Sequence, residues 1–182
     1  MKKMFLALVL VLMLSPIALA KNENLKIGHY NVSFDLNTNK RYNIEDPYSK
    51  ERETFEGDKN IASEISIKDE RKNIWLIFSI VNYGSVQNII FETTKNDIIR
   101  DLKGFAYNDV TIYNRTIDSC DGVLGVGSDD KGYRAFLAIF WPDSYLEGGV
   151  FKGRTKCVLL THYDWDVVSD LLNSINVTEE RT

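Results

Sequence analysis

The segment "YRAFLAIFW", residues 133–141, is apolar at every position from Ala135 to Trp141. Side chains of a strand point alternately to the two faces of its sheet, so a strand with one solvated face alternates between apolar and polar residues. A run that is apolar on both faces is instead typical of a central strand that is covered on both sides. The segment "IWLIFSIV", residues 74–81, has the same character. We therefore predict that both segments are central strands of a sheet.

The surrounding segments predict further strands. Residues 27–36, "IGHYNVSFDL", alternate between a polar and an apolar face, which is typical of a strand covered on one side. Residues 41–44 are expected to pair with this strand across a turn at 37–40. Residues 62–68 are expected to form a hairpin with 74–81. Additional strands are predicted at residues 109–117, 122–127 and 155–161.

Polar and glycine-containing segments predict where the strands are interrupted. Residues 46–60 are rich in charge and contain a proline and a glycine, so they are expected to form a loop. The pair Gly84-Ser85 is expected to end the strand that begins at residue 74. Residues 142–153 are expected to form a second long loop.

Two segments have a helical period. Residues 92–103 predict a helix that stops at Gly104. Residues 164–174 predict a second, amphipathic helix with Asp164 as its N-cap. The apolar stripe of this second helix consists of Trp165, Val168, Leu171 and Leu172. Residues 175–177 return as a short strand or pack as a tail. The fold class predicted from this order is α+β, an antiparallel β-sheet with helices packed on it.

The stretch "NRTIDSCDGVLGVGSDDKG", residues 114–132, contains glycines in a G-x-x-G-x-G spacing that invites comparison with nucleotide-binding loops. A dinucleotide fingerprint needs its glycines between a strand and a helix, whereas these glycines lie between two predicted strands. The aspartate spacing also departs from that of an EF-hand calcium loop. The stretch therefore predicts a twisted hairpin with its turn at residues 128–132.

The first twenty residues have the layout of a secretory signal peptide. Lys2 and Lys3 precede an apolar run, and Ala18 and Ala20 suit a cleavage site before Lys21. Residues 1–20 are thus predicted to be a signal peptide, although an uncleaved N-terminal anchor is the alternative. The rest, residues 21–182, is predicted to be a single globular domain that is secreted or extracytoplasmic and has no membrane span.

The charge of the chain argues against nucleic acid as a partner. Removing Lys2 and Lys3 from the 22 basic residues leaves 20 against 26 acidic ones, a net charge of about −6. The negative sign gives no general attraction to phosphate backbones, and the basic residues are not clustered into a stripe.

Cys120 and Cys157 are the two cysteines of the chain. Exported proteins fold in oxidising surroundings, where paired cysteines commonly form disulfides. We therefore predict a Cys120–Cys157 disulfide, with free buried thiols as the alternative. The two do not form a C-x-x-C motif, so the sequence gives little support for a thioredoxin-like redox role.

His162, Asp164 and Asp166 are the candidate metal ligands. Their alternate spacing could place two of the side chains on one face, but a zinc or calcium site needs three or four ligands. The simpler interpretation is a polar strand end at His162 followed by a helix cap. No catalytic residue and no cofactor is predicted, because the sequence contains no nucleophile motif such as G-x-S-x-G.

Aromatic residues flank the expected loop at 142–153. Trp141, Tyr145 and Phe151 suit either recognition of a partner or anchoring of this loop to the core. Separately, three N-x-[S/T] sequons make Asn31, Asn114 and Asn176 candidates for glycosylation in a secretory pathway that glycosylates.

Three stretches resemble a known family. "YNVSFDL", the pair "TIDSCDGVLGVG" and "YRAFLAIFW", and the ending "VLLTHYDWDVVSDLLNSINV" follow the layout of PsbP-like domains, which are named for an extrinsic photosystem II subunit and include prokaryotic secreted relatives. The family's Y-x-V-x-F element matches Tyr30, Val32 and Phe34, and its closing element matches residues 159–175.

This resemblance implies an α/β/α sandwich of PsbP-like type and a binding or assembly role without catalysis. Residues tied to photosystem binding have no match here, so a photosynthetic role is not carried over. The expected function is that of a secreted or cell-surface binding domain, with an unknown protein or glycan of the cell envelope as partner. The alternative is a metal-dependent hydrolase or metal-binding protein that uses His162, Asp164 and Asp166.

Overall fold

The computed structural model describes residues 21–53, 59–70 and 74–180. In these ranges the elements are β1 (Asn22–Ile27), β2 (Tyr30–Asp35), β3 (Tyr42–Ile44), β4 (Tyr48–Glu53), β5 (Lys59–Asp69), β6 (Trp75–Ile89), α2 (Phe91–Gly104), β7 (Asp109–Ile117), β8 (Cys120–Ser128), β9 (Arg134–Phe140), β10 (Tyr145–Glu147), β11 (Val150–Thr161), α3 (Trp165–Ser174) and β12 (Asn176–Glu179). The predicted signal peptide, residues 1–20, lies outside the described residues. Within the described ranges, no helix combines the length and the apolar character that crossing a membrane requires.

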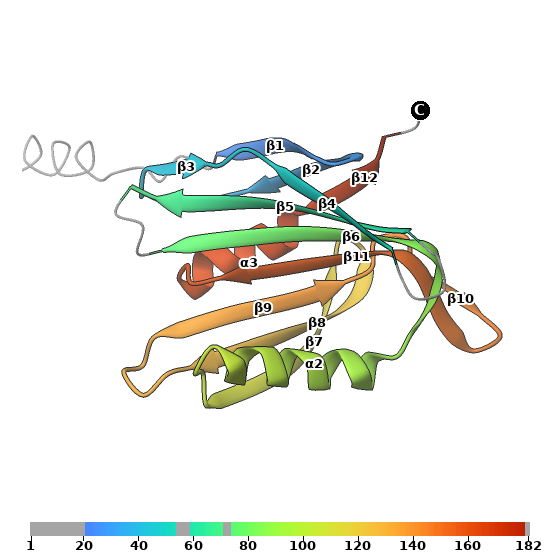
Figure 1. The fold of residues 1–182 in the computed structure, drawn as a ribbon. Coiled ribbons are helices and arrows are strands. Elements are labelled where there is room, and N and C mark those ends of the chain that lie inside the picture. The colour runs from blue at the N-terminus through green and yellow to red at the C-terminus, as the bar shows by residue number, and fades with distance from the viewer. Residues whose placement is uncertain (1–20, 54–58, 71–73, 181–182) are drawn as a thin grey trace, which may run out of the picture.

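The strands of the described residues form two antiparallel sheets (Figure 1). The nine-stranded sheet has the order β3-β5-β6-β11-β9-β8-β7, with β4 paired to β5 and β10 paired to β11. The three-stranded sheet has the order β1-β2-β12. Antiparallel sheets with two helices packed on them belong to the predicted α+β class, although strands dominate the structure more than the sequence suggested.

Both segments predicted to be central strands are central. β9 lies between β8 and β11, and β6 lies between β5 and β11. Successive residues of β9 face two different hydrophobic cores: Phe136, Ala138 and Phe140 face one, and Ala135, Leu137 and Ile139 face the other. Because both faces of β9 are covered, the residues along this strand do not alternate between apolar and polar as they do in a half-solvated strand.

The two helices pack on opposite faces of the large sheet (Figure 1). α2 inserts Ile98 and Leu102 between itself and strands β8 and β9. On the other face, α3 and the small sheet share one core with β6, β9 and β11. Within α3, the buried side chains are those of Val168, Leu171 and Leu172. The predicted helices are therefore confirmed, and their cores lie on either side of β9.

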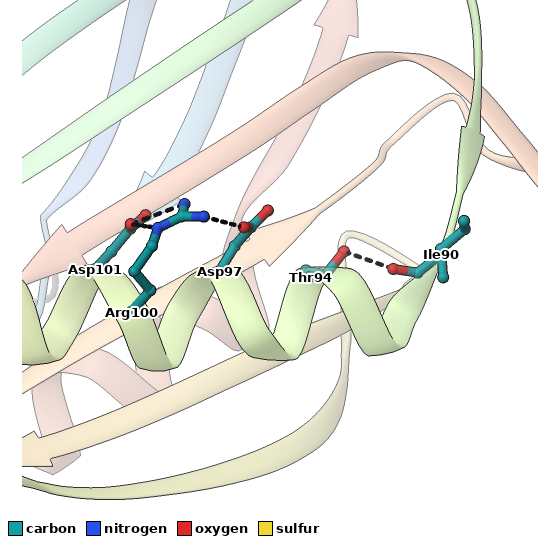
Figure 2. A network of polar contacts seen from close by, with 5 residues as sticks. All are labelled: Ile90, Thr94, Asp97, Arg100 and Asp101. Atoms are coloured by element: carbon teal, nitrogen blue, oxygen red, sulfur yellow. Dashed lines mark hydrogen bonds and ion pairs between the residues drawn. The ribbon is translucent and has the colours of Figure 1, made fainter.

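Figure 2 shows charged contacts on the exposed side of α2 and one hydroxyl contact of Thr94, which is buried. The Arg100 guanidinium lies 2.7 Å from a carboxylate oxygen of Asp97 and 3.1 Å from one of Asp101. At the start of the helix, the Thr94 hydroxyl donates to the carbonyl oxygen of Ile90 at 3.3 Å. Water and salt screen the exposed Arg100 pairs, so these pairs add little to stability and α2 is held mainly by its apolar face.

Three expectations about the strands are wrong, one on pairing, one on a strand end and one on a loop. Residues 41–44 pair with β5 and not with residues 27–36, because the sides of β2 are occupied by β1 and β12. β6 continues through Gly84-Ser85 to Ile89, where it remains paired with β11. The expected loop at 142–153 contains β10, which forms a hairpin with the start of β11.

The expected loop at 46–60 is wrong in part, because residues 48–53 form strand β4. This strand reads "YSKERE" and pairs along the edge of the sheet with β5. An edge strand has no second neighbour, so charged side chains are tolerated there and discourage pairing with another chain. The polar composition of this segment, which predicted a loop, is that of an edge strand.

The glycine-rich stretch forms strand β8 and the following turn, as predicted. Gly125 and Gly127 face α2 and the segment after it. A Cβ atom at Gly125 would lie 2.2 Å from Cγ2 of Ile98, and one at Gly127 would lie 2.7 Å from Cβ of Tyr107. The absence of side chains at these two positions lets α2 approach the sheet closely. The glycines whose spacing resembles that of a phosphate-binding loop thus form the surface on which a helix packs.

The predicted disulfide is absent, since Cys120 and Cys157 are free thiols. In the strand register, Cys157 lies opposite Phe140, and Phe140 lies opposite Gly122 of β8. Cys120 is therefore two strands away from Cys157, or about 10 Å at the usual strand spacing, and a further two residues along β8. A disulfide joins Cα atoms no more than about 7 Å apart. Burial raises the pKa of both thiols, which keeps them protonated.

Candidate functional site

A cavity of about 820 Å³ opens at one end of the large sheet. At this end β6 begins, β11 ends and a turn joins β8 to β9. The cavity is lined by Ile74, Tyr107, Asp129, Gly132, Tyr133, Arg134, Phe136, His162, Tyr163, Asp164 and Trp165. Its walls thus combine aromatic rings with groups that donate and accept hydrogen bonds, which is the usual character of a ligand site. We call it the strand-end cleft.

The junction between β11 and α3 positions His162 in the cleft. The backbone N–H of His162 donates to the carbonyl oxygen of Trp75 at 3.1 Å, which extends the pairing of β11 with β6 by one residue. The imidazole packs edge-on against the Trp75 indole, with 4.2 Å between ring centroids. On its other side, Nε2 of His162 lies 2.6 Å from the hydroxyl of Tyr107. The ring is therefore fixed from two sides.

Burial sets the protonation states of His162 and Tyr163, which lie on this wall of the cleft. The half-buried surroundings of His162 lower the pKa of its imidazole, so the ring is neutral at pH 7. Tyr163 is buried, and its hydroxyl has no hydrogen-bond partner among the described residues. Burial raises the pKa of Tyr163 to about 12, which keeps this hydroxyl protonated. An unpaired buried hydroxyl is costly, and a bound ligand or water could satisfy it.

The opposite wall of the cleft is the turn between β8 and β9. Oδ1 of Asp129 accepts from the backbone N–H groups of Lys131 and Tyr133, both at 2.9 Å. Gly132 supplies the positive φ of 80° that closes this turn. The turn holds Tyr133 at the rim, where 68% of the residue is exposed. The Asp129 carboxylate is thus committed to holding the turn, and the Tyr133 ring is presented to solvent.

A second cavity of about 470 Å³ adjoins the first and shares Arg134, Phe136 and Trp165 with it. Its remaining lining residues are Tyr113, Asn114, Arg115, Leu124 and Val126, which belong to β7 and β8. We call it the side pocket. Trp165 lies between the two cavities, packed on Phe136 with 5.7 Å between ring centroids and 41% exposed. The sequence pattern had placed Trp165 in the buried stripe of the last helix, and this assignment is wrong.

The candidate metal ligands are only partly brought together. His162 and Asp164 both line the strand-end cleft, whereas Asp166 does not line it. Within the described residues, no three or more His, Cys, Asp and Glu side chains are grouped so that they could hold a metal ion. Asp164 stands at the N-cap of α3, as predicted, but its side chain makes no capping hydrogen bond. The predicted cap is therefore right in position and wrong in contact.

The predicted binding loop presents one aromatic ring to solvent. Trp141 is buried and stacks on Tyr83, with 5.7 Å between ring centroids. Phe151 packs edge-on against Phe91 of α2 at 5.3 Å. Tyr145 alone of the three predicted aromatics is exposed, at 48%. Trp141 and Phe151 thus anchor the β10–β11 hairpin to the domain.

The three sequon asparagines are exposed on strands. Asn31 lies on β2, Asn114 on β7 and Asn176 on β12. Nδ2 of Asn176 donates to the Asp118 carboxylate at 3.1 Å, so this amide is already engaged. Glycosylation of these sites stays a prediction.

Most of the cleft could not be assembled from the sequence. The sequence points to His162 because Asp164 and Asp166 follow this histidine at alternate spacing. Sequence reasoning does not find Tyr107, Tyr133 and Arg134, because Tyr107 lies between α2 and β7 while Tyr133 and Arg134 lie where the β8–β9 turn meets β9, and these segments meet only when the strand ends align. An aromatic residue directly beside a turn, as Tyr133 is, was the one available signal. Comparisons with known protein families, with curated proteins and with solved structures return no match.

The low pKa of His162 predicts a measurable pH dependence of stability. The folded state resists protonation of this ring, while the unfolded chain protonates it near pH 6.5. Its contribution to stability is therefore fully present above pH 6.5 and is lost as the pH falls below that value toward the lower pKa of the folded state. We expect the thermal midpoint of the wild type to fall between about pH 7.5 and about pH 5.5.

The variant His162→Gln isolates this contribution, because glutamine can hydrogen-bond to Tyr107 but does not titrate. Its thermal midpoint should fall less than that of the wild type over the same pH interval. Equal falls in the two proteins would show that protonation of His162 does not oppose folding.

Proposed function

We propose that the protein is a non-enzymatic binding domain that acts outside the cytoplasm, and that the strand-end cleft with its side pocket is its ligand site. The observation that carries this proposal is the pair of exposed rings, Tyr133 and Trp165, placed at the mouth of a cavity of about 820 Å³. Rings held in place and left open to solvent suit recognition, because they bury a large area on binding and lose little conformational freedom.

The polar groups of the cleft favour binding over catalysis. Asp129 already accepts two backbone N–H groups, so its carboxylate is a structural acceptor. Nε2 of His162 is engaged by the Tyr107 hydroxyl and the ring packs on Trp75, which fixes its orientation. Groups held in this way suit hydrogen bonding to the hydroxyl and amide groups of a ligand, because their positions do not change on binding.

The fold supports the same role. The large antiparallel sheet carries α2 on one face and α3 with the small sheet on the other, which is compatible with an α/β/α sandwich of PsbP-like type. The resemblance to that family implies binding or assembly. Together with the signal-peptide pattern of residues 1–20, it favours a protein or glycan of the cell envelope as the partner.

Saturation-transfer NMR with a mixed set of mono-, di- and trisaccharides and short peptides tests the proposal. At least one compound should give transfer from the wild type, and Tyr133→Ala and Trp165→Ala should each weaken it about tenfold, as removal of a hot-spot ring does. Tyr145→Ala is the matched control, because Tyr145 is an aromatic residue of similar exposure at the β10–β11 hairpin. The proposal fails if no compound binds, or if binding is indifferent to the two cleft rings.

A further inference from the structure

Two arginine side chains line the side pocket beside Trp165. Arg115 reaches it from β7 and Arg134 from the start of β9, where Arg134 also lines the strand-end cleft. The Arg115 guanidinium lies over the Trp165 ring, 5.4 Å from its centroid. The pocket therefore joins two positive charges to an exposed flat ring.

Among the described residues, neither guanidinium has a carboxylate within ion-pair distance. Arg115 donates to neutral acceptors of α3, at 2.7 Å to Oδ1 of Asn173 and at 3.4 Å to the carbonyl oxygen of Ser169. By contrast, Arg100 on α2 is paired with two aspartates (Figure 2). Arg115 is thus oriented by its contacts while its charge is left unneutralised.

Apart from Asn114, the rest of the side pocket is mainly apolar. Leu124, Val126 and Phe136 form its floor, and Tyr113 lies on its β7 side. Arg115 is partly buried, so water screens its guanidinium less than one on an open surface and its attraction to an anion is stronger, whereas Arg134 is exposed and open to a ligand. Guanidinium groups also match the planar geometry of carboxylates, which they can bind through two parallel hydrogen bonds.

We propose that the side pocket binds the carboxylate of a ligand whose flat, partly apolar body stacks on Trp165. This inference rests on the proposed binding function and specifies its ligand chemistry. Two sources supply that chemistry: sugar acids, whose rings have apolar C–H faces, and aromatic carboxylates. Arg134 at the junction with the strand-end cleft is the main carboxylate partner, and Arg115 holds the Trp165 ring and adds positive charge.

Two matched pairs of probes test the proposal by isothermal titration on the full chain. Trigalacturonate is compared with its neutral methyl ester, and naphthalene-1-acetate with neutral naphthalene-1-acetamide. At least one acid should bind about tenfold more tightly than its neutral partner, as expected when charge-assisted hydrogen bonds are formed. The pair that shows the difference identifies the source. The preference should weaken as the salt concentration rises.

Three variants locate the effect. Arg134→Gln should remove most of the preference for the acid, and Trp165→Ala should weaken acid and neutral partner alike. Arg154→Gln is the control, because Arg154 is an exposed arginine outside both cavities. Each variant is first checked for an unchanged thermal midpoint. For Arg115, which contacts α3, Arg115→Lys keeps the charge and should retain the preference if that variant folds.

The outcomes separate this inference from the proposed function. Equal binding of acid and neutral partner, dependent on Trp165, overturns the inference and leaves the binding function standing. A preference for the acid that survives Arg134→Gln, or that Arg154→Gln also removes, overturns it as well. Absence of binding by both acids overturns the inference, while the proposed function is judged by the mixed saccharide and peptide set.

Discussion

Replacing Phe140 by alanine should lower the free energy of unfolding by about 3–5 kcal/mol, the usual cost of truncating a fully buried aromatic side chain. Phe140 is 0% exposed and ends the central strand β9. Its ring packs near that of Phe78 on β6, with 6.3 Å between centroids. The cavity left behind would lie in the core on the α3 side of the large sheet, where the surrounding strands can collapse only partially.

Denaturant unfolding followed by far-ultraviolet circular dichroism measures this loss, and Leu146→Ala is the control. Leu146 lies on the β10–β11 hairpin and is 62% exposed, so its truncation should change stability by no more than about 0.5 kcal/mol. Similar losses in the two variants would contradict the assignment of β9 as the centre of the core.

Replacing Gly125 by alanine should cost about 1–3 kcal/mol, because the added methyl group overpacks the contact between β8 and α2. The new atom would lie 2.2 Å from Cγ2 of Ile98 and 3.0 Å from Cδ1 of Leu102. Both neighbours are fully buried and have little room to move. The helix must shift outward, and near-ultraviolet circular dichroism should register the change at the neighbouring Tyr107.

Gly104→Ala provides the matched control for this substitution. No atom lies within 4 Å of where its Cβ would be, and the residue ends α2. Alanine is favoured over glycine in a helix by about 0.5–1 kcal/mol, so this variant should be neutral or slightly stabilised. A neutral Gly125→Ala variant would mean that α2 does not approach the sheet as closely as described.

The sequence predicted the elements that burial alone determines. The two runs that are apolar on both faces became central strands, and the helical periods at residues 92–103 and 164–174 became α2 and α3. Alternation and helical period reflect local geometry, which each segment satisfies by itself. The α+β class follows from counting such segments.

Pairing and contact between distant segments could not be predicted in the same way. Nothing in residues 41–44 indicates that β5 is their partner, since the choice depends on β12, which arrives more than 130 residues later to occupy the side of β2. The disulfide was inferred from the compartment, and the register that separates Cys120 from Cys157 is a property of three strands together. The candidate site has the same origin, because its walls come from four connections that meet at one end of the sheet.

The pairing of β2 with β12 also constrains the order in which the protein can fold. Asn31 of β2 lies opposite Thr178 of β12, so one of the first strands of the described chain is completed by the last. Closing so long a loop costs chain entropy before any contact repays it, and such topologies fold slowly. While the ribosome is still synthesising the chain, the edge of β2 that pairs with β12 stays without its C-terminal neighbour. Native structure around the small sheet must therefore form after synthesis has passed residue 179, which makes this corner the last to become protected.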